Sequence, residues 1–246
     1  MMKDAKELMK NSNYIKLGIV YTCMYGVYTS MGAILNTLVQ PYGFGSADAA
    51  EFGGVFITCG LVGSFVASGI IDKYSAYKKV TCAACWGTLI LGLMLLGSLS
   101  YGNKIIVSIN IAALGFFILP IIPIGYSFAV EITFPVSEVM SNGTMSLVAQ
   151  LFGTLLTAIA SEIHSYNEMM VAPFLILIIV IPCILCFFVQ EDLRRAYAES
   201  EVTPNTNSNS FFDSYLQRNS QLKNSQNADN NLRRSSKNKL YIDVPD

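Results

Sequence analysis

Six apolar segments, each long enough to cross the hydrocarbon core of a bilayer, decide what this chain can fold into. A membrane-spanning helix needs about 20 predominantly apolar residues. The segments that meet this length are 14–39, 52–71, 80–99, 105–130, 139–163 and 169–189. They lack the alternation of barrel strands, and the links between them are short. We therefore predict an all-α membrane protein whose six transmembrane helices run up and down in sequence.

Composition agrees with lipid as the main solvent of the chain. Hydrophobic residues make up 52% of it and charged residues only 13%, which is too apolar for a water-facing surface. The net charge of −1 offers no basic face to a nucleic acid, so we exclude that partner. The apolar segments contain no paired carboxylates, Ser/His/Asp set or phosphate-cradling glycine loop. We therefore predict that the chain is not an enzyme and needs no cofactor.

The basic residues predict the orientation of the chain. If both termini are cytoplasmic, the basic residues near the inner helix ends are Lys3, Lys6, Lys10, Lys16, Lys73, Lys78, Lys79, Arg194 and Arg195. The outer loops then hold Lys104 together with Asp48, Glu51, Glu162, His164 and Glu168. Because cytoplasmic loops of membrane proteins are enriched in Lys and Arg, we expect this orientation, in the plasma membrane or an intracellular membrane.

Three parts follow from this pattern. We expect a cytoplasmic segment at 1–13, a six-helix domain at 14–190 and a cytoplasmic tail at 191–246. From Ala196 onward the chain is rich in Asn, Ser and Gln and has too little apolar surface to offset the entropy lost on ordering, so we predict that the tail is largely disordered.

The first apolar segment has two faces. Small, hydroxyl and amide side chains recur on one side at three- and four-residue steps: Gly18, Tyr21, Thr22, Tyr25, Tyr28, Thr29, Gly32 and Asn36. Such a stripe is expected to face protein or water. Packing against a neighbouring helix would explain the glycines. Tyr25 and Tyr28 lie near the middle of the span, so packing and the lining of a ligand pocket are both open for them.

Gln150 is the notable polar residue of the fifth segment. It lies about twelve residues from the start of the segment, which at ~1.5 Å per residue places it close to the bilayer midplane. An interhelical hydrogen bond would satisfy the amide, and contact with a polar substrate is the alternative. Its neighbours Gly153, Thr154 and Thr157 keep the surface small and slightly polar, so we favour the substrate.

The fourth segment contains Pro120 and Pro123, followed by Gly125. Proline removes backbone hydrogen bonds, so this helix should bend or loosen near its centre. A break of this kind is useful in a moving helix but is also common in static membrane helices.

The six cysteines all fall within apolar segments. Cys82 with Cys85 and Cys183 with Cys186 form two C-x-x-C pairs, each with its thiols on one helical face. A soft metal ion is one interpretation of such pairs. Neither has a histidine or a second polar ligand nearby, so we expect small hydrophobic side chains and no metal site.

The stretch PIGYSFAVEITFPVSEVMSNG, with AQLFGTLLT after it, resembles the tenth and eleventh helices of the feline leukaemia virus subgroup C receptor family of major facilitator transporters. The matching positions are Pro123, Gly125, Phe128, Ala129, Val130, Glu131, Ile132, Thr133, Pro135, Ser137, Glu138, Gly143, Gln150, Phe152 and Gly153. GIIDKYSAYKK resembles the loop between the eighth and ninth helices of the family. GVYTSMGAILN is similar to its seventh helix.

The resemblance covers residues 8–192 and implies the C-terminal six-helix half of a twelve-helix transporter. By this resemblance, family members move choline or ethanolamine, and haem export has also been ascribed to them. The glutamine that matches Gln150 lines their substrate site, and the family's aromatic residue on the seventh helix falls near Tyr28 or on Thr29. Tyr25 and Tyr28 would give a choline-like cation the aromatic faces that quaternary ammonium groups prefer.

Charged residues at the cytoplasmic helix ends are expected to form an inner gate or helix-end ion pairs, because hydrated charges can exchange partners as the halves move. These residues are Asp72, Lys73, Lys78, Lys79, Glu131 and Glu138.

The sequence thus predicts a half-length transporter for a small organic solute, with choline or ethanolamine favoured and haem as a further candidate. Its expected partners are the bilayer, the solute, and either a second six-helix half or a second copy of the chain. The alternative is a membrane protein that does not transport, either a truncated fragment or a subunit that binds another half-transporter.

Overall fold

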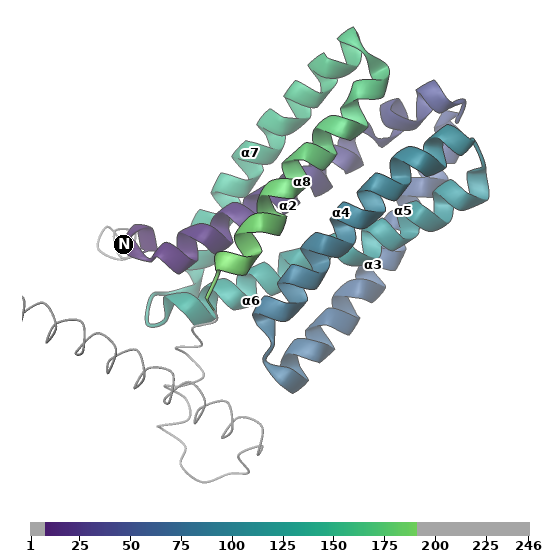
Figure 1. Cartoon of the computed structure of the whole chain (residues 1–246). Coiled ribbons are helices and arrows are strands. Elements are labelled where there is room, and N and C mark those ends of the chain that lie inside the picture. The colour runs from purple at the N-terminus through teal and green to yellow at the C-terminus, as the bar shows by residue number, and fades with distance from the viewer. Residues whose placement is uncertain (1–7, 191–246) are drawn as a thin grey trace, which may run out of the picture. The chain divides into compact units, whose positions relative to one another are not determined.

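The computed structural model describes residues 8–190, and every structural statement below concerns this part of the chain (Figure 1). The helices are α2 (Ser12–Val39), α3 (Ser46–Tyr74), α4 (Tyr77–Tyr101), α5 (Lys104–Ile118), α6 (Ile121–Thr133), α7 (Glu138–Tyr166) and α8 (Val171–Phe188), with short 3-10 turns at Gln40–Tyr42 and Glu168–Met170. They form 6 spans that are long and apolar enough to cross a membrane. The prediction of an all-α, six-span membrane protein is confirmed. The predictions for residues 1–7 and for the tail at 191–246 lie outside the described residues.

The fourth span consists of two helices, as its prolines predicted. The amide of Leu119 still donates to the carbonyl of Gly115 at 3.1 Å, but Pro120 has no N–H to continue the ladder. The amide of Ile122 turns to Leu119 at 3.1 Å, and regular bonding resumes when Ile124 donates to Pro120 at 3.2 Å. The break between α5 and α6 therefore comes from the local loss of a backbone donor.

Two groups of helices make up the bundle. α2 packs against α7, α8 and α6, whereas α5 packs against α3 and α4. Contacts between α4 and α8 join the two groups along their length. Figure 1 shows α2, α7 and α8 side by side, with α3, α4 and α5 beside them.

The pair α2–α7 runs parallel and in register. The hydroxyl of Tyr14 donates to the carbonyl of Ser141 at 2.7 Å, and the hydroxyls of Ser30 and Thr157 lie 2.9 Å apart; in both pairs the partners are 127 residues apart in sequence. Gly26 and Gly153 are also 127 residues apart, and they face each other: a Cβ placed at Gly153 would lie 3.5 Å from the Cα of Gly26. Small residues at this interface let the two backbones approach closely.

The pair α3–α5 is also held by glycines. A Cβ at Gly63 would overlap the carbonyl oxygen of Phe116, and a Cβ at Gly115 would overlap that of Phe56. The two contacts are reciprocal, since each helix offers a glycine to the backbone of the other. This close packing sets the position of α5, the first helix of the fourth span.

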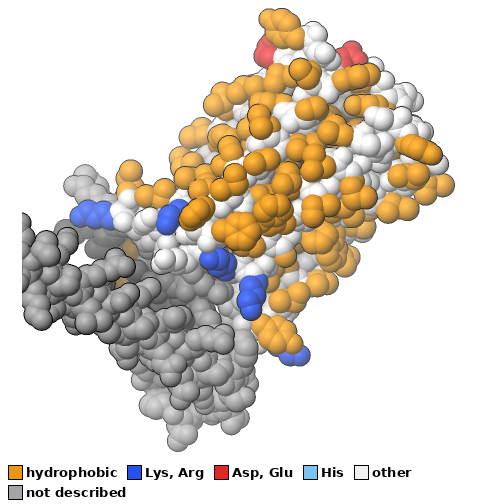
Figure 2. Space-filling view, viewed as in Figure 1, with side chains coloured by type: hydrophobic (Ala, Val, Ile, Leu, Met, Phe, Trp, Pro, Cys, Tyr) orange, Lys and Arg blue, Asp and Glu red, His pale blue; other side chains and the backbone are white. Residues whose placement is uncertain are grey.

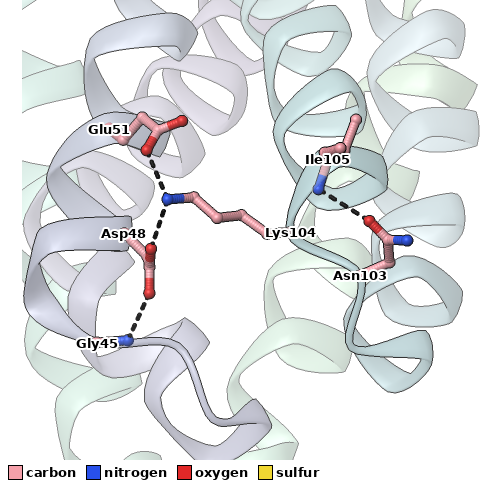
Figure 3. A network of polar contacts seen from close by, with 6 residues as sticks. All are labelled: Gly45, Asp48, Glu51, Asn103, Lys104 and Ile105. Atoms are coloured by element: carbon pink, nitrogen blue, oxygen red, sulfur yellow. Dashed lines mark hydrogen bonds and ion pairs between the residues drawn. The ribbon is translucent and has the colours of Figure 1, made fainter.

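An ion-pair clasp joins the beginning of α3 to the beginning of α5 (Figure 3). The ammonium of Lys104 lies 2.7 Å from a carboxylate oxygen of Asp48 and 2.7 Å from one of Glu51. Asp48 also accepts a hydrogen bond from the amide of Gly45 at 3.1 Å, which caps α3. The prediction that these carboxylates lie in an outer loop is wrong, because capping extends α3 beyond the apolar segment and places both in its first two turns.

His164 was also expected in an outer loop, and that expectation is wrong. It lies in the last turns of α7, which continues to Tyr166. There it lines a small cavity of about 60 Å³ between α2, α7 and α8. Ser161, Glu162 and Ser165 are exposed in these last turns.

Charge is distributed unequally between the two ends of the bundle: Lys104 lies at the mainly acidic end, and Asp72, Glu131 and Glu138 lie at the mainly basic end. Figure 2 shows carboxylates at one end, basic side chains at the other, and a surface dominated by hydrophobic side chains between them. At the basic end, Lys16 and Lys78 donate to the carbonyls of Phe188 and Phe187 at 3.4 and 2.9 Å. These bonds satisfy carbonyls that the last turn of α8 leaves unpaired.

Candidate functional site

The polar stripe of α2 divides into a buried part and an open part. Tyr21 and Thr22 are buried, whereas Tyr25 and Tyr28 are half-buried and Asn36 is exposed. The opposite face, which includes Val20 and Met24, is fully buried in the bundle. α2 is therefore a central helix that turns its apolar side to the other helices and part of its polar side to an open face.

A row of aromatic rings crosses this face. The ring centroids of Tyr126 and Tyr21 lie 5.3 Å apart, those of Tyr21 and Tyr25 5.8 Å, those of Tyr25 and Tyr28 6.1 Å, and those of Tyr28 and Phe56 6.1 Å. The row therefore joins α6, α2 and α3. We call these five side chains the aromatic row.

The aromatic row depends on a glycine for its close approach. A Cβ at Gly125 would overlap the ring of Tyr21, so only glycine lets α6 and α2 meet at this level. Gly125 lies one turn after the break between α5 and α6, which sets the direction of α6. Sequence reasoning found Tyr25 and Tyr28 but did not find Tyr126 or Phe56. Tyr126 lies within the stretch PIGYSF, whose resemblance to the family was a signal that could have found it.

A cavity of about 280 Å³ opens between α2 and α3 at the Phe56 end of the row. α2 contributes Tyr28, Thr29 and Gly32 to its wall, and α3 contributes Gly53 and Phe56. The lining is mostly apolar, because Met31, Leu35 and Ile57 complete the wall, and it carries no formal charge. A cavity of this kind can hold a small solute whose charge is met by ring faces and not by a counter-ion.

Gln150 lies on α7, on an exposed strip next to the row. Ser146, Gln150 and Thr154 follow at four-residue steps and so share one side of the helix. The hydroxyl of Ser146 is 2.7 Å from that of Tyr126, which ties the strip to the aromatic row. The side chain of Gln150 itself is exposed.

The register of α2 and α7 gives the depth of Gln150. With the spacing of 127 residues, Gln150 is level with Cys23 and so lies between the levels of Tyr21 and Tyr25. The structure brings Tyr25 and Tyr28 together and places Gln150 on a neighbouring helix, about one turn from the level of Tyr28. Within residues 8–190, no ring contact or hydrogen bond joins the Gln150 amide to either tyrosine.

The six predicted gating residues all lie near the basic end of the bundle. Asp72, Lys73 and Lys79 are exposed at the junction of α3 and α4, and the Lys73 ammonium is 5.4 Å from the ring centroid of Tyr74. Lys78 binds the end of α8 as described above. Glu131 is half-buried in α6, and Glu138 is the first residue of α7. A gating role for them stays a prediction.

The described part of the chain contains no group of three or more His, Cys, Asp or Glu side chains placed to hold a metal ion.

No family model matches the chain. Among curated proteins, it is 30% identical over 200 residues to the choline/ethanolamine transporter FLVCR2 of Homo sapiens, an alignment that covers 80% of this chain and 38% of the human protein. It is 30% identical over 195 residues to the choline/ethanolamine transporter FLVCR1 of Felis catus, covering 78% of this chain and 35% of that protein. It is also 29% identical over 197 residues to an uncharacterized MFS-type transporter of Caenorhabditis elegans, covering 79% and 34%.

Together, the 6 spans and these matches define a multi-pass integral membrane protein related to major facilitator transporters. More particularly, the chain is a relative of the choline/ethanolamine transporters named for the feline leukaemia virus subgroup C receptor, which confirms the resemblance in its motifs. The chain spans well under half the length of these curated relatives.

Proposed function

We propose that residues 8–190 form one wall of a transport pathway for a small organic cation of the choline class. The observation that carries this proposal is the aromatic row, which runs along an open polar face into an uncharged cavity of about 280 Å³. The cation needs no acidic side chain there, because each ring face attracts a quaternary ammonium by about 0.5–2 kcal/mol.

The proposed roles follow from the depth of each group. Tyr25 and Tyr28 present ring faces to the ammonium, and Phe56 closes the far side of the cavity. Gln150, on the exposed strip of α7, offers its amide to the hydroxyl of the solute. Ethanolamine would fit the same arrangement, because its primary ammonium could also donate to the hydroxyl of Thr29. In support, two of the relatives cited above are named choline/ethanolamine transporters.

Haem, the other solute that the resemblance implied, is not part of this proposal. Haem is a large macrocycle with two carboxylates, whereas the cavity at the aromatic row has a volume of about 280 Å³ and carries no charge to meet them.

Transport also requires movement and a second wall. Major facilitator proteins hold their solute between two six-helix halves that rock against each other. We infer that the open face of α2 and α7 meets the second half of such a pathway, supplied by another six-helix segment or by a second copy. The α5–α6 break is a place where one part of the fourth span can tilt while the other stays packed on α3.

The proposed orientation places both termini in the cytoplasm. Its support is the unequal distribution of charge, with the mainly basic end inside and the Asp48–Lys104–Glu51 clasp outside. The inner end would then carry Asp72, Lys73, Lys78, Lys79, Glu131 and Glu138, where a gate between the halves would form.

Binding of tritiated choline to the purified chain in lipid nanodiscs tests the proposal without a need for the second wall. We expect saturable binding that Gln150→Ala weakens. Leu151→Ala is the matched control, because Leu151 is the next residue of α7 and its side chain is 67% exposed on the hydrophobic surface. Equal binding by all three proteins, or none, would contradict the proposal and favour a membrane protein that does not transport.

A further inference from the structure

Two pairs of cysteines meet where α4 and α8 pack together. Cys82 and Cys85 belong to α4, and Cys183 and Cys186 to α8; all four are free thiols. The thiol of Cys183 donates to the carbonyl of Cys85 at 3.3 Å. The thiol of Cys186 is within hydrogen-bonding reach of those of both Cys82 and Cys85. Cys186 is thus the shared partner of the two thiols from the other helix.

The two thiols next to Cys186 differ in accessibility. Cys85 is 0% exposed, whereas Cys82 is partly exposed. The cluster lies near the basic end of the bundle, within the first turns of α4 and the last turn of α8. Cys82 is therefore the thiol of the two that a small reagent reaches first.

A positive charge acts on one of the two possible pairs. The ammonium of Lys78 interacts electrostatically with both Cys82 and Cys186. Its position is fixed by the 2.9 Å hydrogen bond to the carbonyl of Phe187, the residue after Cys186. The charge therefore marks the Cys82–Cys186 pair, because it acts on both of its thiols.

We propose that Cys82 and Cys186 are a modification site that forms a reversible disulfide between α4 and α8 when the protein meets a peroxide. The thiol of Cys82 gives up its proton and attacks one oxygen of hydrogen peroxide. The O–O bond breaks, Cys82 becomes a sulfenic acid, and the leaving hydroxide takes up the proton and departs as water. The thiol of Cys186 then attacks the sulfur of the sulfenic acid, forms the S–S bond and releases a second water. Two thiols lose two electrons, and one peroxide is reduced to two waters.

The disulfide would link α4 to α8 near the basic end of the bundle. Trp86 of α4 and Phe187 of α8 already pack there, with ring centroids 6.0 Å apart. The bond would thus hold an existing helix contact in place. The aromatic row belongs to α6, α2 and α3 and shares no residue with the cluster, so this inference does not depend on the proposed transport function.

The test is peptide mapping of the full chain in lipid nanodiscs, treated with hydrogen peroxide, blocked with N-ethylmaleimide and digested with trypsin and chymotrypsin without reduction. Cleavage after Leu185 separates Cys183 from Cys186. We expect a peptide pair joined through Cys186 whose mass is lower by two hydrogen atoms and which dithiothreitol separates. Cys82→Ser should abolish the cross-link, whereas Cys85→Ser should retain it.

Two outcomes would overturn the proposal. One is oxidation of Cys82 to sulfinic acid in the wild-type chain without any cross-link. The other is a cross-link that survives Cys82→Ser and disappears in Cys85→Ser. The wild-type chain and the Cys85→Ser variant both keep Cys82, so the result does not depend on correct folding of Cys82→Ser.

Discussion

Gly153 of α7 lies directly against Thr29 of α2. A Cβ at position 153 would come within 2.6 Å of the Thr29 hydroxyl, closer than side-chain carbons approach other atoms. Thr29 is fixed by its own hydrogen bonds to the carbonyls of Gly26 and Tyr25, at 3.0 and 3.1 Å. This contact lies beside the aromatic row and sets how closely α7, which carries Gln150, approaches α2.

Gly153→Ala should therefore push α7 away from α2. Overpacking of this kind costs about 1–3 kcal/mol. Thr29→Ala removes the obstructing hydroxyl, so the double variant should recover part of the loss, and the coupling between the two positions should be clearly non-additive. Thermal unfolding in detergent measures the change, with Gly143→Ala as the control because nothing lies within 4 Å of a Cβ there. Simple additivity of the two changes would contradict the contact.

Gly63→Ala should destabilise the bundle at the α3–α5 contact. The added methyl meets the backbone carbonyl of Phe116, which cannot turn away as a side chain can. We expect a loss of about 1–3 kcal/mol in the free energy of unfolding. Gly54→Ala on the same helix has open space around its Cβ and should be neutral or slightly stabilising. Equal unfolding temperatures for the two variants would show that α3 and α5 are not this close.

Lys104→Gln should remove both ion pairs of the outer clasp. The clasp is exposed, so its contribution is small and is screened by salt. We expect a slightly lower unfolding temperature at low ionic strength, and a difference from wild type that disappears at high salt. Lys79→Gln, a change of an exposed lysine at the other end of the bundle, is the control. A loss that persisted unchanged at high salt would argue against an electrostatic clasp.

The orientation can be checked with a thiol placed at the acidic end. Tyr101 is 80% exposed at the end of α4, close to the clasp. With both termini cytoplasmic, Tyr101→Cys should react with a membrane-impermeant maleimide applied to the face of the membrane opposite the cytoplasm. Ser75→Cys, at the junction of α3 and α4, should react only from the cytoplasmic face. The reverse pattern of labelling would invert the proposed topology.

Sequence reasoning identified the spans because their apolar lengths are a direct requirement of the bilayer. It placed the break in the fourth span for a similar reason, since Pro120 removes a backbone donor wherever the helix packs. It failed at helix ends, where Asp48 caps α3 and His164 continues α7. Hydropathy measures where lipid begins, and helices extend beyond lipid wherever capping groups or polar surface support them.

Contacts between distant segments were harder to predict. The periodicity of α2 placed Tyr25 and Tyr28 on one face, but Tyr126 and Phe56 join them only because α6 and α3 pack beside α2. The two C-x-x-C pairs were each visible in the sequence. Their meeting was not, because Cys85 and Cys183 are 98 residues apart and a single sequence does not reveal which helices are neighbours.

The central claim is that the aromatic row binds an organic cation, and the affinity of Tyr28 variants for choline tests it most directly. Tyr28→Phe keeps a ring face and should bind tritiated choline with close to wild-type affinity. Tyr28→Ala removes the ring between Tyr25 and Phe56 and should weaken binding by about 1–2 kcal/mol, roughly five- to thirty-fold. Equal affinities for wild type, Tyr28→Phe and Tyr28→Ala, in proteins that remain folded and monodisperse, would contradict the account.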